Sequence, residues 1–263
     1  MLALVVSVDA EHAEIASDSL WGLGVLAVEE RQMPDGSIEL WTALGDDPDL
    51  DRVQFRWPWR LEWVDDAVVD TWREFAVPIV VEPDLVVIPA WLVADTPVQT
   101  YAIRIEPGPT FGLGDHPTSR LSLSALRRVI VAGDSVLDVG SGSGILAIGA
   151  VIFGAVSAVG IDISPAAVPV GLANAIANGV ERSVSFATTP LEQIVDQFDV
   201  VVANILAPTL IALSADLVRV TGSTLIISGL LADRYIHVVE SLRPLVVESV
   251  VETDGWVAVT LRR

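Results

Sequence analysis

Apolar and polar positions along the chain follow two different patterns, and the change falls near residue 134. Beyond it, short runs of consecutive apolar residues alternate with longer segments that have the length and spacing of helices. Consecutive apolar runs are typical of strands buried on both faces, and the intervening segments are typical of helices that cover a sheet. We therefore predict an α/β fold with βαβ units and a doubly wound, mainly parallel sheet.

Seven strands are predicted for this sheet. The first five cover residues 135–140, 157–162, 183–187, 198–205 and 223–228. The helices between and after them cover residues 144–154, 164–179, 208–220 and 230–242. Residues 245–263 are interpreted as two strands joined at Asp254 and Gly255, a pair typical of tight hairpin turns. The last strand is therefore expected to be antiparallel to its neighbour.

The first 64 residues show a shorter alternation of elements. Strands are predicted over 2–8, 25–31 and 37–43, with a helix over 10–24 and a turn at 33–36. These elements indicate a small α+β domain, which we expect to be ferredoxin-like.

Three tryptophans stand close together before the end of this first region. Trp57, Trp59 and Trp63 fall within residues 56–64. We interpret them as strand packing, with a binding surface as the alternative.

Residues 65–109 are expected to connect the two regions. A short helix is predicted over 65–75, with Asp65 or Asp66 as its N-cap. The Pro-rich stretch that follows favours extended edge pieces and loops. The predicted domains are thus 1–64, 65–109 and 110–263.

Composition excludes several kinds of function. The formal net charge of -20 argues against a surface for nucleic acid and favours a basic partner. All 15 cationic residues are Arg, and the absence of Lys excludes a Schiff-base lysine or the lysine of a P-loop. The chain has no Cys, and its three histidines, His12, His116 and His237, are widely spaced, so we expect no metal site.

We expect a cytoplasmic protein, because the amino terminus lacks the basic start, apolar stretch and cleavage site of an export signal. No charged residue occurs between Asp138 and Asp162, a length that by hydropathy alone could span a bilayer. Glycines interrupt this interval, and aspartates flank it where a span would favour Lys or Arg. We therefore predict a strand, a loop, a buried helix and a second strand there, and no membrane contact.

A glycine-rich loop after residue 139 is the main candidate for a ligand site. Gly140, Gly142 and Gly144 stand between a strand and a helix, where absent Cβ atoms let a ligand approach the backbone. Asp138 precedes the first glycine by two positions, and the third glycine comes one residue earlier than in a dinucleotide fingerprint. A carboxylate there repels a pyrophosphate and suits a cationic ligand. S-adenosylmethionine (SAM) fits, since it carries an ammonium, a sulfonium and no phosphate.

Two further polar residues end neighbouring strands. Asp162 is predicted to accept hydrogen bonds from both ribose hydroxyls, while Ser164, before Pro165, would cap the following helix. Asn204 ends the fourth strand at the same crevice, where its amide oxygen and a neighbouring backbone carbonyl can hold the two N–H groups of a methyl-accepting amine. The alternative for both residues is a helix cap.

Several segments together resemble the PrmA family, the methyltransferases of ribosomal protein L11. They are "FGLGDHPTSRLSL", "VLDVGSGSGILAI", "GIDISPAAV", "LANAIANGV", "DVVVANILAP" and "DGWVAVTLRR", with a weaker likeness in "AEIASDSLWGLGVLAVEE". The resemblance implies a class I SAM-dependent methyltransferase with an N-terminal domain for substrate recognition. The "ANILA" motif favours this family over relatives with an Asn-Pro-Pro-Tyr motif.

The resemblance also implies a set of site residues. Residues 111–120 would fold over the methionine end of the cofactor, with a hydroxyl contact. The cofactor-binding set is Thr118, Ser119, Asp138, Gly140, Ser141, Gly142, Asp162, Ile163 and Asn204, and the catalytic set is Asn204 and Ile205. We interpret His116 and Pro117 as fixing the shape of this loop, in preference to an acid–base role for the histidine.

Three departures from the family pattern bear on these expectations. Leu113 replaces a threonine and Asp115 adds a charge, which leaves substrate choice and turnover open. No acidic residue follows the third strand, so Thr188 or Thr189 would stand near the adenine instead.

The expected function is SAM-dependent N-methylation of amino groups on ribosomal protein L11, by in-line displacement at the methyl carbon. A lysine acceptor must first lose its proton, and burial favours this because it lowers a lysine pKa. Three alternatives remain: a methyltransferase of another protein or a small molecule, a cofactor-binding homologue without turnover, and a dehydrogenase, which Asp138 disfavours.

Overall fold

The computed structural model describes residues 2–9, 12–21, 28–43, 56–63, 77–93, 100–106 and 114–263. The chain forms two compact units, Met1–Ala76 and Val77–Arg263. Each unit is described by itself below. The helix predicted over 65–75 lies outside the described residues.

The first unit contains a four-stranded antiparallel sheet with the strand order β2-β3-β1-β4. Its elements are β1 (Leu2–Val8), α1 (Ala13–Trp21), β2 (Glu29–Gln32), β3 (Ile38–Ala43) and β4 (Trp59–Trp63). Helix α1 packs on one face, where alternate residues of β1 and β3 form the core. The strands predicted over 2–8 and 37–43 are thus confirmed, and so is the hairpin turn between β2 and β3.

The ferredoxin-like form of this unit stays a prediction. That fold has a second helix between the third and fourth strands. In this chain it would fall within residues 44–55, which lie outside the described residues.

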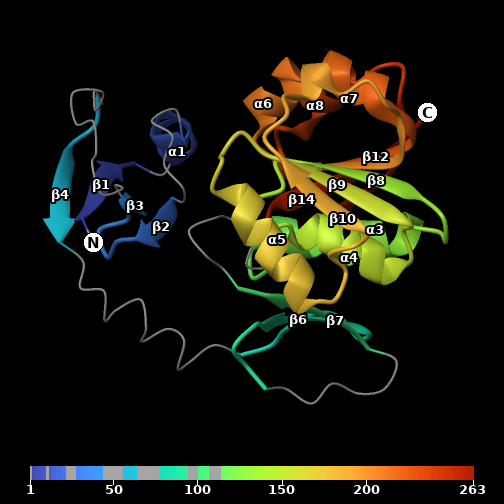
Figure 1. Cartoon of the computed structure of the whole chain (residues 1–263). Coiled ribbons are helices and arrows are strands. Elements are labelled where there is room, and N and C mark those ends of the chain that lie inside the picture. Colours follow the sequence, from blue (N-terminus) through green and yellow to red (C-terminus); the bar gives the residue numbers. More distant parts are fainter. Residues whose placement is uncertain are drawn as a thin grey trace. The chain divides into compact units, whose positions relative to one another are not determined.

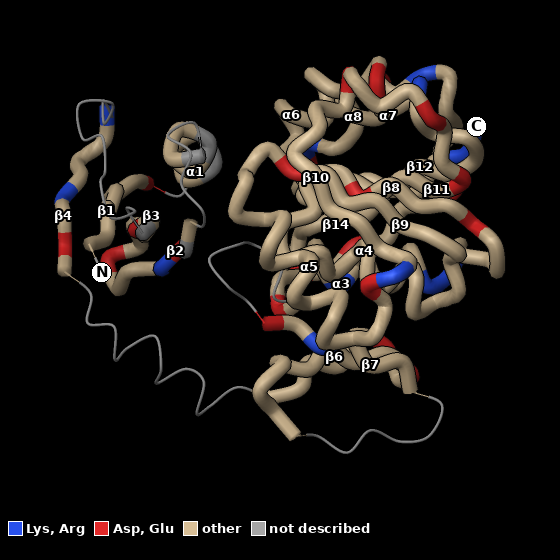
Figure 2. Tube along the Cα trace, viewed as in Figure 1, with Lys and Arg blue, Asp and Glu red and all other residues tan. Residues whose placement is uncertain are grey.

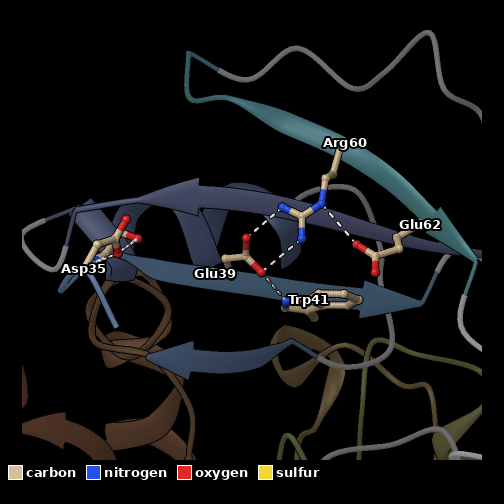
Figure 3. A network of polar contacts seen from close by, with 6 residues as sticks. Asp35, Glu39, Trp41, Arg60 and Glu62 are labelled. Atoms are coloured by element: carbon tan, nitrogen blue, oxygen red, sulfur yellow. Dashed lines mark hydrogen bonds and ion pairs between the residues drawn. The ribbon is translucent and has the colours of Figure 1, made fainter. Parts of the chain in front are cut away.

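The face of this sheet opposite α1 carries a polar network (Figure 3). Glu39 accepts hydrogen bonds from Arg60 Nη1 and Nη2, at 2.7 and 3.1 Å, and from Trp41 Nε1 at 3.0 Å. Arg60 Nε also donates to Glu62 at 3.0 Å. The bidentate bond from Arg60 lowers the pKa of Glu39, so the carboxylate stays ionised although its residue is buried.

The prediction of tryptophan packing is only partly correct. Trp57 packs against the core of the first unit. Trp59 and Trp63, in contrast, are 42% and 80% exposed. Both lie on β4, which among the described strands has only β1 as a sheet neighbour.

The second unit is built on a seven-stranded sheet with the order β10-β9-β8-β11-β12-β14-β13. The strands are β8 (Ser135–Val139), β9 (Ser157–Ile161), β10 (Val184–Ala187), β11 (Phe198–Asn204), β12 (Thr221–Leu231), β13 (Val246–Thr253) and β14 (Trp256–Arg262). Strands β8 to β12 pair in parallel, whereas β14 is antiparallel to both β12 and β13. This confirms the predicted sheet and its antiparallel last strand.

Helices cover both faces of this sheet (Figure 1). One face carries α3 (Pro117–Val129), α4 (Ile145–Phe153) and α5 (Ala167–Ala177), and the other carries α6 (Ala207–Ala212), α7 (Ser214–Val220) and α8 (Tyr235–Ser241). A short 3-10 helix, η3 (Leu191–Gln193), precedes β11. The single helix predicted over 208–220 is interrupted at Leu213, where the chain leaves helical geometry with ψ near 2°.

The charge-free interval between Asp138 and Asp162 folds as predicted into β8, a loop, α4 and β9. Helix α4 has nine residues, and neither it nor α5 carries a charged side chain, as Figure 2 shows. Among the described residues, no helix combines the length and apolar character needed to cross a bilayer.

A three-stranded sheet forms a further layer of the second unit. It consists of β5 (Ile79–Glu82), β6 (Leu85–Pro89) and β7 (Tyr101–Ile105), in the order β5-β6-β7. Its apolar residues share one core with α3 and α4. We expected these extended pieces to belong to a linker. They belong to the second unit instead, because their apolar side chains are buried there.

Among the described strands β7 has only β6 as a neighbour, and its other edge is bonded by two side chains, Asn174 of α5 and Asn178, the C-cap of α5. Asn178 Oδ1 accepts from Arg104 N at 2.8 Å, and its Nδ2 donates to Arg104 O at 2.7 Å. One helical turn earlier, Asn174 exchanges the same two bonds with Glu106, at 2.8 and 3.1 Å. Each amide thus makes the pair of bonds that a residue of a neighbouring antiparallel strand would make.

Candidate active site

The candidate site lies where β8, β9 and β11 end. The chain passes from β8 to β9 on one side and returns to β11 on the other, so a crevice opens beyond the carboxyl end of β8. Asp138 is the penultimate residue of β8, Asp162 follows β9 directly, and Asn204 ends β11. Because these strands are parallel neighbours, their three polar side chains come to the same edge of the sheet.

The loop after β8 needs its glycines for two reasons. Gly140, Gly142 and Gly144 have φ values of 77°, 50° and 80°, a region that side chains with a Cβ rarely adopt. A Cβ on Gly140 would also lie 2.4 Å from Ile205 Cγ2, and one on Gly144 would lie 2.6 Å from the Phe186 ring. The loop therefore packs its backbone directly against two side chains.

Backbone bonds fix this loop to the end of β9. The N–H groups of Gly140 and Ser141 both donate to Ile161 O, at 2.8 and 3.0 Å. Gly144 N donates to Ser141 O at 2.7 Å, which closes the inner turn of the loop.

Asp162 holds the same loop through its carboxylate. Oδ2 accepts from Gly142 N and Oδ1 accepts from Ser164 N, both at 2.8 Å. The prediction that Ser164 caps α5 is wrong, since the helix begins at Ala167 and its N-cap, Ala166, makes no side-chain bond. Asp162 is thus engaged by the protein, yet each carboxylate oxygen keeps a further lone pair for a ligand.

We expect Asp162→Ala to weaken SAM binding by about 1–3 kcal/mol, because charge-assisted bonds to a ligand and to the loop are lost together. Isothermal titration measures the change. Asp199→Ala is the matched control: Asp199 accepts two bonds from Ser135 at the opposite ends of β8 and β11. Asp199→Ala should lower the free energy of unfolding and leave the Kd for SAM unchanged. Equal Kd values for wild type and Asp162→Ala would refute a ligand role.

Asp138 is a buried carboxyl with one oxygen unpartnered. Its Oδ2 accepts from Ala147 N at 3.1 Å, while its Oδ1 has no hydrogen-bond partner among the described residues. Burial raises the pKa of Asp138 to about 7, and repulsion from Asp162 adds to the rise. A buried oxygen of this kind is rare in native proteins and calls for a proton or a ligand.

The start of α3 contributes buried hydroxyls. His116 caps the helix: its Nδ1 accepts from Thr118 N at 3.3 Å and lies 2.8 Å from Thr118 Oγ1, while Pro117 is the first helical residue. Burial lowers the pKa of His116. Its ring packs edge-on against the Trp256 ring, with the two ring centroids 5.0 Å apart. Ser119 is 1% exposed, and its Oγ has no hydrogen-bond partner among the described residues.

Ser228 connects the start of α3 to the edge where Asn204 lies. It pairs with Asn204 in the β11–β12 ladder, and its Oγ is 3.4 Å from Thr118 O. The hydroxyls of Thr118 and Ser119 therefore belong to the same end of the sheet as the glycine loop. Asn204 itself is half-buried.

Ile205 is enclosed between two glycines. Its side chain fills the space over Gly140, and a Cβ on Gly229 would lie 2.6 Å from its carbonyl oxygen. Gly229 has a φ of 82°. The backbone of Ile205 is thus held in place from both sides.

The remaining predicted residues fall around this edge. Ile163 is 97% exposed beside Asp162. Thr188 and Thr189 follow β10, the parallel neighbour of β9. Asp115 is exposed, and Leu113 lies outside the described residues. Within the described ranges, no three acidic or histidine side chains gather as metal ligands would.

Two residues that shape the site had not been singled out from the sequence. Gly229 limits the position of Ile205, and Asn174 Nδ2 donates to Ser143 O in the glycine loop at 2.9 Å. The spacing of Asn174 and Asn178, four residues apart on one helix face, was the available signal for a shared role.

The strand order, with an antiparallel strand inserted beside the far edge and the glycine loop at the switch point, defines the class I methyltransferase fold. The family model described as ribosomal protein L11 methyltransferase (PrmA) matches residues 4–263, and the chain belongs to this family.

Individual relatives agree with this assignment. The ribosomal protein L11 methyltransferase of Geobacter metallireducens is 45% identical over 171 residues, which are 64% of this chain and 56% of that protein. Its counterpart in Symbiobacterium thermophilum is 36% identical over 215 residues, 80% of this chain and 68% of the relative. The crystal structure of ribosomal protein L11 methylase from Lactobacillus delbrueckii subsp. bulgaricus aligns with a TM-score of 0.66 and 29% identity, covering 71% of this chain and 98% of that one. The chain thus spans little more than half the length of the Geobacter relative.

Proposed function

We propose that this chain is a SAM-dependent protein N-methyltransferase that acts on amino groups of ribosomal protein L11. Membership of the PrmA family supports the reaction and the substrate. The observation that carries the choice of cofactor is the unpartnered, buried Oδ1 of Asp138 beside a loop of left-handed glycines. A cationic ligand satisfies this oxygen, whereas a phosphate would be repelled by it.

The proposed cofactor contacts follow from the positions of the residues. Gly140, Ser141 and Gly142 are assigned to the loop beside the ligand, and a cationic ligand would hold the Asp138 carboxyl in its ionised form. Asp162 keeps lone pairs for the ribose hydroxyls, and the exposed Ile163 offers an apolar surface to the adenine. Thr118 and Ser119 are assigned to the methionine end. When bound, SAM supplies a methyl group already activated by its sulfonium.

The chain's own contribution to the transfer is to position a neutral amine. The Asn204 amide oxygen and the Ile205 carbonyl are proposed to accept the two N–H groups of the amine, which aims its lone pair. The tight enclosure of Ile205 between Gly140 and Gly229 supports this role, because it limits movement of that carbonyl. The acidic chain, with a net charge of -20, suits a basic ribosomal protein, and such a substrate places the reaction in the cytoplasm.

The test is transfer of label from methyl-labelled SAM to purified ribosomal protein L11, followed by mass analysis. We expect L11 to gain methyl groups, and we expect Asn204→Ala to reduce transfer about 100-fold or more while changing SAM affinity about threefold at most. Equal losses in transfer and affinity would contradict the amine-positioning role. SAM binding without any transfer would favour a homologue that has lost turnover, and transfer only to another protein would replace the substrate.

A further inference from the structure

Asn174 connects the glycine loop to a segment far away in the sequence. Its side chain is buried in α5, with the residue 1% exposed. Its Nδ2 donates to Ser143 O at 2.9 Å and to Glu106 O at 3.1 Å, and its Oδ1 accepts from Glu106 N at 2.8 Å. Both amide hydrogens and the amide oxygen are therefore used.

The bond to Ser143 acts on a strained part of the loop. Ser143 stands between Gly142 and Gly144, which both have positive φ, and it is fully buried. Other bonds hold the N–H groups on either side of it, to Asp162 and to Ser141. Asn174 holds the carbonyl of the same turn from the opposite side, and so fixes the orientation of the peptide between Ser143 and Gly144.

Loss of this donor has a specific consequence. Removing the Asn174 donor takes a hydrogen bond from a buried carbonyl, which costs about 1–3 kcal/mol, and the peptide between Ser143 and Gly144 loses the contact that orients it from this side. A shift of this peptide would move the backbone of Gly142, which belongs to the proposed site. A change at Asn174 would thus reach the ligand through the loop.

We propose that Asn174 is a positioning residue for cofactor binding, acting through the Ser143 carbonyl. The inference rests on the proposed SAM site. Asn178 is a natural control, because it makes the same two bonds to β7 and a third to Asn174 O, and makes no bond to the glycine loop.

The test compares Asn174→Ala with Asn178→Ala in the full chain, by urea unfolding and by titration with S-adenosylhomocysteine. Both variants lose edge bonds to β7, so we expect similar losses of stability. We expect the Kd of Asn174→Ala to rise about tenfold or more, and that of Asn178→Ala to rise about threefold or less. A merely structural role would move stability in both variants and leave the two Kd values alike.

A second pair keeps the inference testable if an alanine variant does not fold. Asn174→Asp and Asn178→Asp keep the shape and the acceptor and remove the amide donors. If the two alanine variants, or the two aspartate variants, both fold and have equal Kd values, the role of Asn174 is overturned. Absence of binding by the wild-type chain would instead overturn the proposed cofactor site, so the two failures are distinct.

Discussion

Gly140→Ala should abolish detectable SAM binding and lower the free energy of unfolding by about 2–5 kcal/mol. A residue with a Cβ pays about 1–2 kcal/mol at the left-handed φ of 77°. The new Cβ would also stand 2.4 Å from Ile205 Cγ2, and overpacking of this kind costs about 1–3 kcal/mol. Ile205 has little room to withdraw, because its carbonyl is packed against Gly229. Urea unfolding and calorimetric titration measure the two losses.

Two comparisons separate the clash from the backbone strain. Gly255 has a φ of 80° and no atom within 4 Å of an added Cβ, so Gly255→Ala should show the backbone cost alone. In the Gly140→Ala background, Ile205→Ala should restore part of the stability, whereas Ile205→Val, which keeps the branch at Cβ, should not. Equal losses at Gly140 and Gly255 would rule out the contact with Ile205 as the cause.

Asp138→Asn should raise stability at pH 8 while lowering affinity for SAM. The pKa of Asp138 rises from 3.8 to about 7 on folding, so between about pH 4 and 7 the folded state holds a proton that the unfolded state has released. The contribution of Asp138 to the free energy of unfolding is therefore greatest at low pH. It falls as the pH rises through that window and levels off above it. The full fall is on the order of 4 kcal/mol, at about 1.4 kcal/mol per pKa unit.

The asparagine variant avoids this fall but cannot supply negative charge to a cationic ligand. We expect it to lose about 1.5–3 kcal/mol of binding free energy, the range for hydrogen bonds to charged groups. Unfolding midpoints of wild type and Asp138→Asn at pH 5 and pH 8 measure the change in stability. Titrations of both proteins with SAM at pH 8 measure the change in affinity. A pH dependence of stability that is the same in wild type and Asp138→Asn would show that Asp138 ionises normally.

The large sheet could be predicted from the sequence because each of its strands has a recognisable local pattern. Strands buried on both faces appear as continuous apolar runs, and Asp254 and Gly255, with φ values of 53° and 80°, form the turn that their residue types favour. The sequence does not show that β5, β6 and β7 pack in the second unit, because prolines and short apolar runs do not reveal which core will bury them. The break at Leu213 was missed for a similar reason, since no glycine or proline marks it.

The candidate site was predictable as far as it depends on motif spacing. The positions of Asp138, Asp162 and Asn204 at strand ends follow from alternation along the chain. Contacts between residues far apart in the sequence could not be predicted from motif spacing. The packing of Gly229 against Ile205 and the bond from Asn174 to Ser143 depend on tertiary approach, and the two bonds of Asp162 to backbone N–H groups depend on the loop's detailed shape.

The amides of α5 along β7 also bear on how the protein avoids self-association. An edge strand with free N–H and C=O groups is a template for strands of other molecules, especially when it is rich in apolar residues, as Tyr101–Ile105 is. Asn174 and Asn178 occupy the groups of Arg104 and Glu106 that would otherwise recruit such a strand. These two amides therefore oppose the pairing of a strand from another molecule at Arg104 and Glu106.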